Sequence, residues 1–363
     1  MPAARLSRPN EAGARAPLRL MPTTPQLASL PKAELHLHLE GSVRPTTAAE
    51  LAARYGEPIA PEEVAARYRY TDFSGFIEAF KWITSLLRTP GDYALVTRRL
   101  AEELVRQNVV YAEITISAGV MLRRAQDVEA NFAAIRDAAA EQPFRSLRTA
   151  WIFDSARQFG SEAALDVARR AAALAGSGVV AFGMGGDELA HPAEHFRPAF
   201  EFARSRGLHL VCHAGEIGGP GSVRDAAEIL GAERIGHGIA VMHDARLAES
   251  LAARRIVLEN CPTSNLCTGA LARQTGKPDA SLADHPLARL AERGSLVTLS
   301  TDDPGMFHTD LLTEYSRAAS LGLSNAQVVK LVAQSFHAAF LPPEDRLALA
   351  GNLERAAKSS GLL

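Results

Sequence analysis

The chain has 363 residues, 47% of them hydrophobic, which is enough to bury one large core. Its formal net charge of -2 provides no positive field for a phosphate backbone or an anionic lipid surface. This charge argues against nucleic-acid and membrane partners and favours a small-molecule partner. Three sparsely placed cysteines favour a reducing compartment, the cytoplasm. No apolar run is long enough to predict a membrane span.

Residues 1–27 differ in composition from the rest of the chain. They combine several arginines and prolines with a single acidic residue, and no apolar segment of the kind found in secretory signals follows. We therefore predict a disordered tail over 1–27 and a single domain over 28–363.

Short β-branched or apolar runs alternate with longer amphipathic segments from about residue 33 onward. Eight runs are predicted to be strands: Ala33–Leu39, Val109–Ser117, Leu147–Asp154, Val179–Gly183, His209–His213, Arg234–Gly238, Ile256–Cys261 and Leu296–Thr301. The predicted helices include Tyr93–Asn108, Val128–Ala140, Glu162–Ala175, Ala193–Arg206, Ser222–Leu230 and Pro286–Arg293. Eight strands separated by helices predict a (β/α)8 TIM barrel.

The segment from Thr46 to Pro90 is longer than one crossover helix requires, and it is predicted to form a helical excursion over the barrel mouth. Phe73, Phe76 and Phe80 recur at helical spacing within it. This spacing is typical of an apolar helix face, which either packs on the core or covers a ligand.

Polar residues of metal-binding type stand at the ends of the predicted strands. In the first strand, His36 and His38 are two residues apart, so their side chains point to the same side, into the barrel. The ends of later strands add His213, Glu216, His237, Asp302 and Asp303. Because reactive groups of such barrels collect at the carboxyl ends of the strands, we expect these side chains to meet.

Three imidazoles and one carboxylate suit Zn²⁺, with water completing the shell, although these ligand types also admit iron, manganese and cobalt. No lysine lies on the fourth strand to bridge two metals, so we expect one metal per chain. The glycine-rich end of that strand, residues 183–188, matches no phosphate-binding motif. Its glycines are better suited to let a flat heterocycle approach the backbone.

Five segments, in this order, resemble the signatures of the adenosine deaminase family within the amidohydrolase superfamily. They are PKAELHLHLEGS (31–42), HAGE (213–216), RIGHG (234–238), CPTSN (261–265) and STDDP (300–304). The resemblance implies that zinc is bound by His36, His38, His213 and Asp302, that the catalytic groups are Glu216, His237 and Asp303, and that Gly186 contacts the purine.

The resemblance also implies a reaction, the hydrolytic removal of the 6-amino group from an adenosine-like nucleoside. His237 would orient and help deprotonate a zinc-bound water, and Asp303 would accept a hydrogen bond and contact purine N7. Protonated Glu216 would donate to N1, which makes C6 electrophilic. The partners implied are a purine nucleoside and water.

The resemblance is less specific about the substrate than about the reaction. Glu40 stands where many family members carry an aspartate for a ribose hydroxyl, and the family covers its nucleoside with the region that holds Phe73 and Phe76. Residues 71–119 resemble the bacterial 6-aminodeoxyfutalosine deaminases of menaquinone biosynthesis, whose substrate carries a carboxylated aryl group at the 5′ end. Arg88 and Arg157 are candidate partners for that carboxylate. The expected substrate is adenosine or such a 5′-modified adenosine. Adenine and AMP are alternative substrates, and a non-catalytic ligand-binding barrel is a further alternative.

Overall fold

The computed structural model describes residues 24–363. Eight strands pair in parallel, each with the next along the chain, in the order β1 to β8. Their bounds are β1 Lys32–His38, β2 Val109–Ile116, β3 Arg148–Ala156, β4 Val179–Gly185, β5 His209–Ala214, β6 Arg234–His237, β7 Val257–Asn260 and β8 Val297–Leu299. All eight predicted strands are present, and every predicted end lies within two residues of the observed end.

The barrel closes between its first and last strands without a regular ladder. Residues just beyond β8 make the connection: the backbone N–H of His38 donates to the carbonyl of Asp302 over 2.8 Å, and the N–H of Asp302 donates to the carbonyl of His36 over 3.0 Å. Leu37 and Asp302 form an isolated parallel bridge at the same place. Closure thus occurs at three predicted ligand positions, His36, His38 and Asp302.

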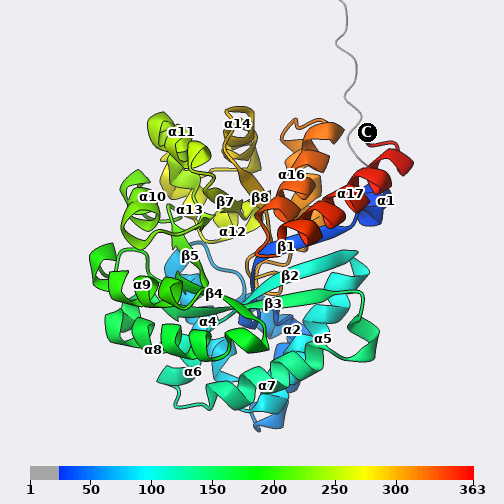
Figure 1. Ribbon diagram of the computed structural model, residues 1–363. Helices are drawn as coiled ribbons and strands as arrows, with labels where there is room; N and C mark the ends of the chain where they lie inside the picture. Colours follow the sequence, from blue (N-terminus) through cyan, green and yellow to red (C-terminus); the bar gives the residue numbers. More distant parts are fainter. Residues whose placement is uncertain (1–23) are drawn as a thin grey trace, which may run out of the picture.

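Helices surround the strands on the outside, which gives the predicted (β/α)8 TIM barrel (Figure 1). Their bounds are α1 Thr24–Ser29, α2 Pro45–Arg54, α3 Pro61–Arg67, α4 Phe73–Ser85, α5 Pro90–Arg106, α6 Ala118–Arg123, α7 Val128–Ala139, α8 Gly160–Ala173, α9 Arg197–Ser205, α10 Pro220–Asp225, α11 Ala245–Ala253, α12 Pro262–Cys267, α13 Ala270–Thr275, α14 Leu287–Glu292, α15 Leu311–Ser320, α16 Asn325–Ala338 and α17 Pro343–Ser359. Among the described residues, no helix is both long and apolar enough to cross a membrane.

Two predicted helices are only partly α-helical. The segment predicted as Ala193–Arg206 begins as a 3-10 turn, and α9 starts only at Arg197. Pro198 explains this start, because proline is tolerated in the first helical turn and not in a helix interior. The segment predicted as Ser222–Leu230 starts earlier, at Pro220, and after Asp225 it continues as a π-helical turn to Leu230.

The excursion between β1 and β2 consists of α2, α3 and α4. Asp72 caps α4 by accepting a hydrogen bond from the N–H of Gly75 over 2.8 Å. The helix then presents a row of aromatic rings, in which the centroids of Phe73 and Phe76, and those of Phe76 and Phe80, are 5.9 Å apart. This row faces the cavity at the carboxyl ends of the strands.

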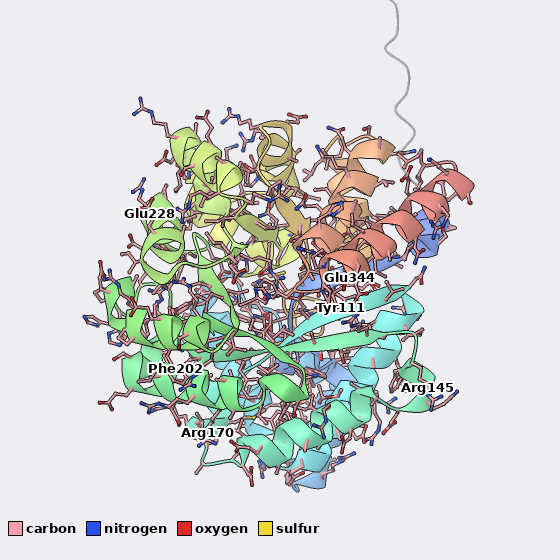
Figure 2. The ribbon with its side chains drawn as sticks, viewed as in Figure 1. Tyr111, Arg145, Arg170, Phe202, Glu228 and Glu344 are labelled. Atoms are coloured by element: carbon pink, nitrogen blue, oxygen red, sulfur yellow. The ribbon has the colours of Figure 1, made fainter. Side chains whose placement is uncertain are left out.

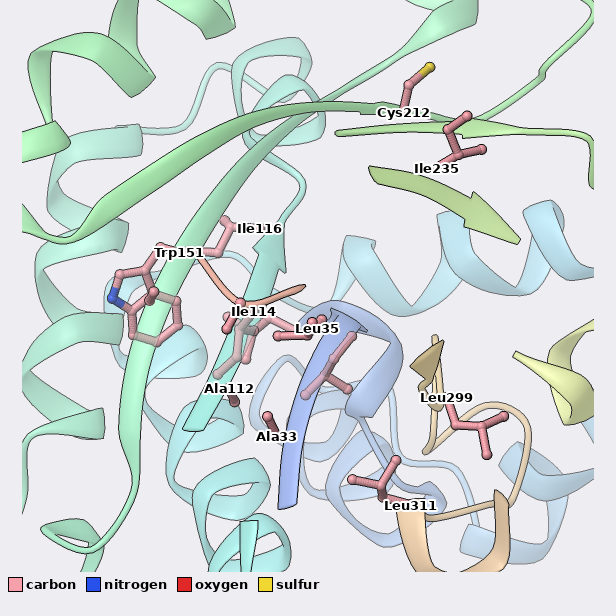
Figure 3. Packing of buried hydrophobic residues seen from close by; sticks show 14 of the residues in the cluster. Ala33, Leu35, Ala112, Ile114, Ile116, Trp151, Cys212, Ile235, Leu299 and Leu311 are labelled. Carbon is pink, nitrogen blue, oxygen red and sulfur yellow. The ribbon is translucent and has the colours of Figure 1, made fainter. Parts of the chain in front are cut away.

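The strands are buried on both faces, as expected of a parallel sheet that helices cover. Figure 3 shows Leu35, Ile114 and Trp151 among the packed side chains, and each is at most 2% exposed. Charged side chains such as Arg145 and Glu344 lie at the outside (Figure 2).

Most of the predicted tail, residues 1–23, lies outside the described residues. Its last four residues begin α1, where Leu27 is buried, so the described ordered chain starts before residue 28. Figure 1 shows α1 beside α17, and the side chain of Gln26 donates to the carbonyl of Ser360 over 2.8 Å.

Candidate active site

Four residues with metal-binding side chains meet at the carboxyl ends of the strands. His36 and His38 end β1, His213 lies on β5, and Asp302 follows β8. Nε2 of His38 lies 3.2 Å from Nε2 of His213, and Nε2 of His36 lies 3.3 Å from Oδ1 of Asp302. One ligand atom from each of the four lies within 4.8 Å of all the others. The structure therefore brings the predicted ligand set together.

Three further observations show that the cluster fits a metal ion. Nε2 of His36 is buried and has no hydrogen-bond partner among the described residues, so a donor atom is available. Gly236 leaves room for this ring, because a Cβ at that position would lie 2.5 Å from Cε1 of His36. Asp302 has a φ of +66°, a strained conformation for a residue other than glycine, as is common at functional sites.

Buried charges hold one predicted ligand, His36, from behind. Nδ1 of His36 lies 2.8 Å from Oε2 of Glu259, whose Oε1 lies 2.6 Å from Nε of Arg234. Arg234 also pairs with Glu113, which is completely buried. Burial alone would raise the pKa of Glu259, but Arg234 and His36 outweigh burial and lower it. Glu259 is thus a carboxylate that orients His36, an arrangement typical of metal-binding histidines.

Two more ligands are held by neutral groups. Nδ1 of His213 lies 3.2 Å from the carbonyl oxygen of Met184 on β4. The hydroxyl of Ser264 donates to Oδ2 of Asp302 over 2.7 Å. Sequence reasoning missed these supporting residues, although charged residues inside strands that are otherwise apolar were a visible signal for Glu113 and Glu259.

The three predicted catalytic residues lie beside this cluster and line the same cavity. Nε2 of His237 is 3.5 Å from Oε2 of Glu216 and 3.8 Å from Oδ2 of Asp302. Burial, reinforced by the charge of Asp302, raises the pKa of Glu216 to about 8. Burial and the same neighbour also raise the pKa of Asp303. Without metal, Glu216 is therefore mostly protonated at neutral pH, which suits it to donate a proton.

Glu188 fixes the loop that carries Glu216. Its carboxylate accepts hydrogen bonds from the N–H groups of Glu216, Ile217 and Gly218 over 3.1, 2.9 and 2.8 Å. Glu188 belongs to the glycine-rich segment after β4, but its role was not predicted. Its bonds to consecutive amides hold the loop in one conformation and so position Glu216 over the cavity.

A cavity of about 780 Å³ opens above the cluster. Its wall is formed by the aromatic face of α4, by Phe159 and by Gly186. Three of the four predicted ligands, His38, His213 and Asp302, and the three predicted catalytic groups also line it. Gly186 has a φ of +83°, and a Cβ there would lie 2.3 Å from Oε1 of Gln158. A side chain at this position would therefore disturb the wall.

The predicted substrate-binding residues separate into two groups. Phe73, Phe76 and Gly186 line the cavity. Glu40 is buried behind it, where Oε1 accepts the N–H of Ser117 over 3.0 Å. Arg157 also lies outside the cavity wall, because its guanidinium donates to the carbonyl of His191 over 3.1 Å and packs on Phe196.

The alternative arginine, Arg88, is likewise away from the site. It pairs with Glu57 over 2.7 Å on the surface. The arginines that do line the cavity are Arg123 and Arg124, on and just after α6, and sequence reasoning did not single them out.

Comparison with known proteins agrees with this geometry. Residues 31–356 match the adenosine deaminase family. The chain belongs to the adenosine deaminase family. As a family member with the amidohydrolase-type barrel, it is an aminohydrolase.

Two curated relatives and one solved structure of this deaminase family illustrate the similarity. An aminodeoxyfutalosine deaminase of Streptomyces avermitilis is 41% identical, over 90% of this chain and 91% of its own length. An adenine deaminase of Rhizobium leguminosarum bv. trifolii is 36% identical, over 89% and 99%. The crystal structure of an adenine deaminase from Arthrobacter aurescens aligns with a TM-score of 0.83 and 27% identity, over 91% and 99% of the two chains.

Proposed function

We propose that this deaminase uses one Zn²⁺ to hydrolyse the 6-amino group of a purine nucleoside extended at its 5′ end, with 6-aminodeoxyfutalosine as the preferred substrate. The observation that carries the reaction is the buried set of three histidines and one aspartate beside Glu216, whose raised pKa keeps it protonated. Water adds at C6, the C6–N bond breaks, and the products are the 6-oxopurine and ammonia.

The metal would be held by His36, His38, His213 and Asp302. When bound, Zn²⁺ lowers the pKa of water from 15.7 to about 7, which supplies a nucleophile at neutral pH. Glu216 donates its proton to purine N1 and makes C6 electrophilic, and it then returns a proton to the departing nitrogen. His237 orients the nucleophile, and Asp303 hydrogen-bonds to the purine at N7.

Two arginines in the cavity wall support a substrate with an anionic extension. Arg124 donates to two neutral acceptors, the carbonyl of Lys81 and the hydroxyl of Thr84, over 3.0 and 3.1 Å. Arg123 lies over the ring of Phe159, with 5.2 Å between its Cζ and the ring centroid. Among the described residues neither arginine has an acidic partner, so two positive charges are available to a carboxylate.

The curated relatives leave two substrate classes to separate. Similarity to aminodeoxyfutalosine deaminases favours the extended nucleoside, whereas similarity to adenine deaminases favours the free base. A free base would leave Arg123 and Phe159, which line the same cavity, without a partner. The cavity therefore favours the extended nucleoside.

The test is ammonia release by zinc-loaded protein, measured in parallel on 6-aminodeoxyfutalosine, adenosine, adenine and AMP. We expect the highest kcat/KM for 6-aminodeoxyfutalosine. Silence on all four substrates with zinc bound would refute the reaction. Preference for adenine would establish the alternative substrate.

The variant Arg123→Ala tests whether this arginine recognises the anionic 5′ group of the substrate. Loss of a hydrogen bond to a charged group predicts a KM for 6-aminodeoxyfutalosine that is about 10- to 100-fold higher, with adenosine unaffected. Arg169→Ala, at an exposed position of α8 outside the cavity, is the matched control. An equal loss on both nucleosides would contradict recognition of the 5′ group.

A further inference from the structure

Behind His237, away from the cavity, two buried polar side chains form a chain of hydrogen bonds. Nδ1 of His237 lies 3.1 Å from the amide nitrogen Nδ2 of Asn265, and Oδ1 of Asn265 lies 3.1 Å from Nε2 of His285. Nδ1 of His285 accepts the backbone N–H of Leu287 over 3.2 Å. His285 is 3% exposed, Asn265 is fully buried, and neither lines the cavity.

The backbone N–H of Leu287, at the outer end of this series of hydrogen bonds, fixes which atoms donate and which accept. A backbone N–H can only donate, so Nδ1 of His285 is an acceptor and carries no proton. Burial lowers the pKa of His285 to about 3, and the nearby Arg289 adds to the effect, so the ring is neutral. A neutral ring has one N–H, which must therefore be at Nε2.

The donor and acceptor roles of Asn265 and His237 follow from the protonation of His285 at Nε2. Nε2–H of His285 donates to the carbonyl oxygen of Asn265, and this bond fixes which end of the amide faces His237. The amide nitrogen can only donate, so Nδ1 of His237 is an acceptor. The outer amide N–H of Leu287 thus determines the hydrogen-bonding role of His237.

We infer that Leu287, His285 and Asn265 hold His237 as the tautomer protonated at Nε2, so that His237 presents an N–H donor to the cavity. A neutral imidazole in this form donates a hydrogen bond from Nε2 and cannot take up a proton at that atom. This differs from the sequence expectation that His237 helps to deprotonate water. His285 and Asn265 are positioning residues.

Because His237 cannot accept a proton at Nε2, the attacking water of the proposed deamination must lose its proton to another group. This consequence for turnover rests on the proposed function. The proton lost by the attacking water must pass to a carboxylate. Glu216, once it has protonated the purine ring nitrogen, is such a carboxylate, and its Oε2 lies 3.5 Å from Nε2 of His237. His237 then contributes by orienting the nucleophile through a donated hydrogen bond.

Nitrogen-15 NMR of histidine-labelled protein tests the tautomer directly, since long-range ¹⁵N–¹H couplings distinguish the two ring nitrogens. We expect His237 and His285 to be protonated at Nε2 and not at Nδ1, both without metal and with zinc. Signals are assigned by their loss in His237→Gln and His285→Gln. A wild-type His237 protonated at Nδ1 would overturn the inference, whatever the activity.

Two variants test the consequence. His285→Leu removes the donor that orients Asn265, and we expect kcat to fall about tenfold with little change in KM. His285→Gln keeps an N–H donor and should restore most of kcat. Equal activity and an unchanged His237 tautomer in His285→Leu would overturn the positioning role.

Asn265→Asp provides a second, independent variant. A carboxylate can only accept, so His237 should move its proton to Nδ1, and kcat should fall by at least tenfold. Retention of the Nε2–H form in this variant would contradict the mechanism. If wild-type protein shows the expected tautomer but deaminates no substrate, the proposed function fails while the hydrogen-bond chain stands.

Discussion

Glu216 and Asp302 are neighbouring carboxyl groups whose surroundings drive their pKa values apart. Burial raises the pKa of Glu216 to about 8, with little compensation from nearby positive charge. Asp302 is equally buried, but its interaction with His36 outweighs burial and holds its pKa well below the usual range. One carboxyl group is therefore an acid and the other an anion, a division of roles that supports proton donation by Glu216 and metal binding by Asp302.

A substitution that removes the acidic proton of Glu216 provides the first test. Glu216→Gln keeps the size of the side chain but cannot transfer a proton, so we expect kcat to fall by at least about 100-fold. Zinc content, measured by atomic absorption, should stay at one per chain because Glu216 is not among the four clustered ligands. Near-normal turnover in this variant would rule out Glu216 as the proton donor.

The pH dependence of kcat/KM gives a second test. Glu216 acts in its protonated form, so the rate should fall as pH rises through the pKa of the free enzyme. Bound zinc favours the carboxylate form, so we expect this fall at or below about pH 8, the value that burial sets without metal. A profile measured from pH 6 to 10 that keeps rising through pH 9 would contradict this assignment. The residual rate of Glu216→Gln should lack the same limb.

Strand geometry decides which site residues could be placed from the sequence. His36 and His38 could be placed because alternation along a strand fixes which side chains share a face. Arg157 could not, because it follows β3 in a 3-10 turn, where no such alternation indicates direction. Its guanidinium turns to Phe196 instead of the cavity.

Contacts between different helices and loops could not be predicted from the sequence either. The bonds of Asn265 and His285 join α12 to the loop before α14, and their direction depends on a backbone N–H that no motif marks. The cavity wall formed by α6 was likewise missed, since a six-residue helix carries little periodic signal. Sequence patterns thus predicted the strand ends but not the contacts between the segments that follow them.

The end of β6 supplies a prediction at this scale. Gly236→Ala would place a Cβ 2.5 Å from Cε1 of His36 and displace that ring from the ligand cluster. We expect zinc affinity to fall by at least tenfold, as measured by competition with a chromophoric chelator. Gly219→Ala is the matched control, because a Cβ at Gly219 meets nothing within 4 Å. Equal zinc affinity in both variants would show that His36 is not held by this close contact.

The whole molecule depends on the same cluster for closure of its barrel. The ligands come from β1, β5 and the segment after β8, and the backbone bonds between His36, His38 and Asp302 join the first strand to the last. A metal ion bound there would therefore connect segments from both ends of the chain. The unfolded chain cannot assemble this set, so metal binding should stabilise the folded barrel.

Thermal unfolding with and without zinc tests this coupling. At free zinc 100 times its Kd, binding adds about 2.7 kcal/mol to the free energy of unfolding. For a domain of this size we expect a rise in Tm on the order of 5 °C, which should reverse on chelation. His38→Ala removes one ligand without removing the backbone bond that closes the barrel, so its Tm should respond much less to zinc. An equal response in this variant would place the stabilising zinc elsewhere. A response confined to the wild type would mean that one ion serves both the proposed chemistry and the closure of the fold.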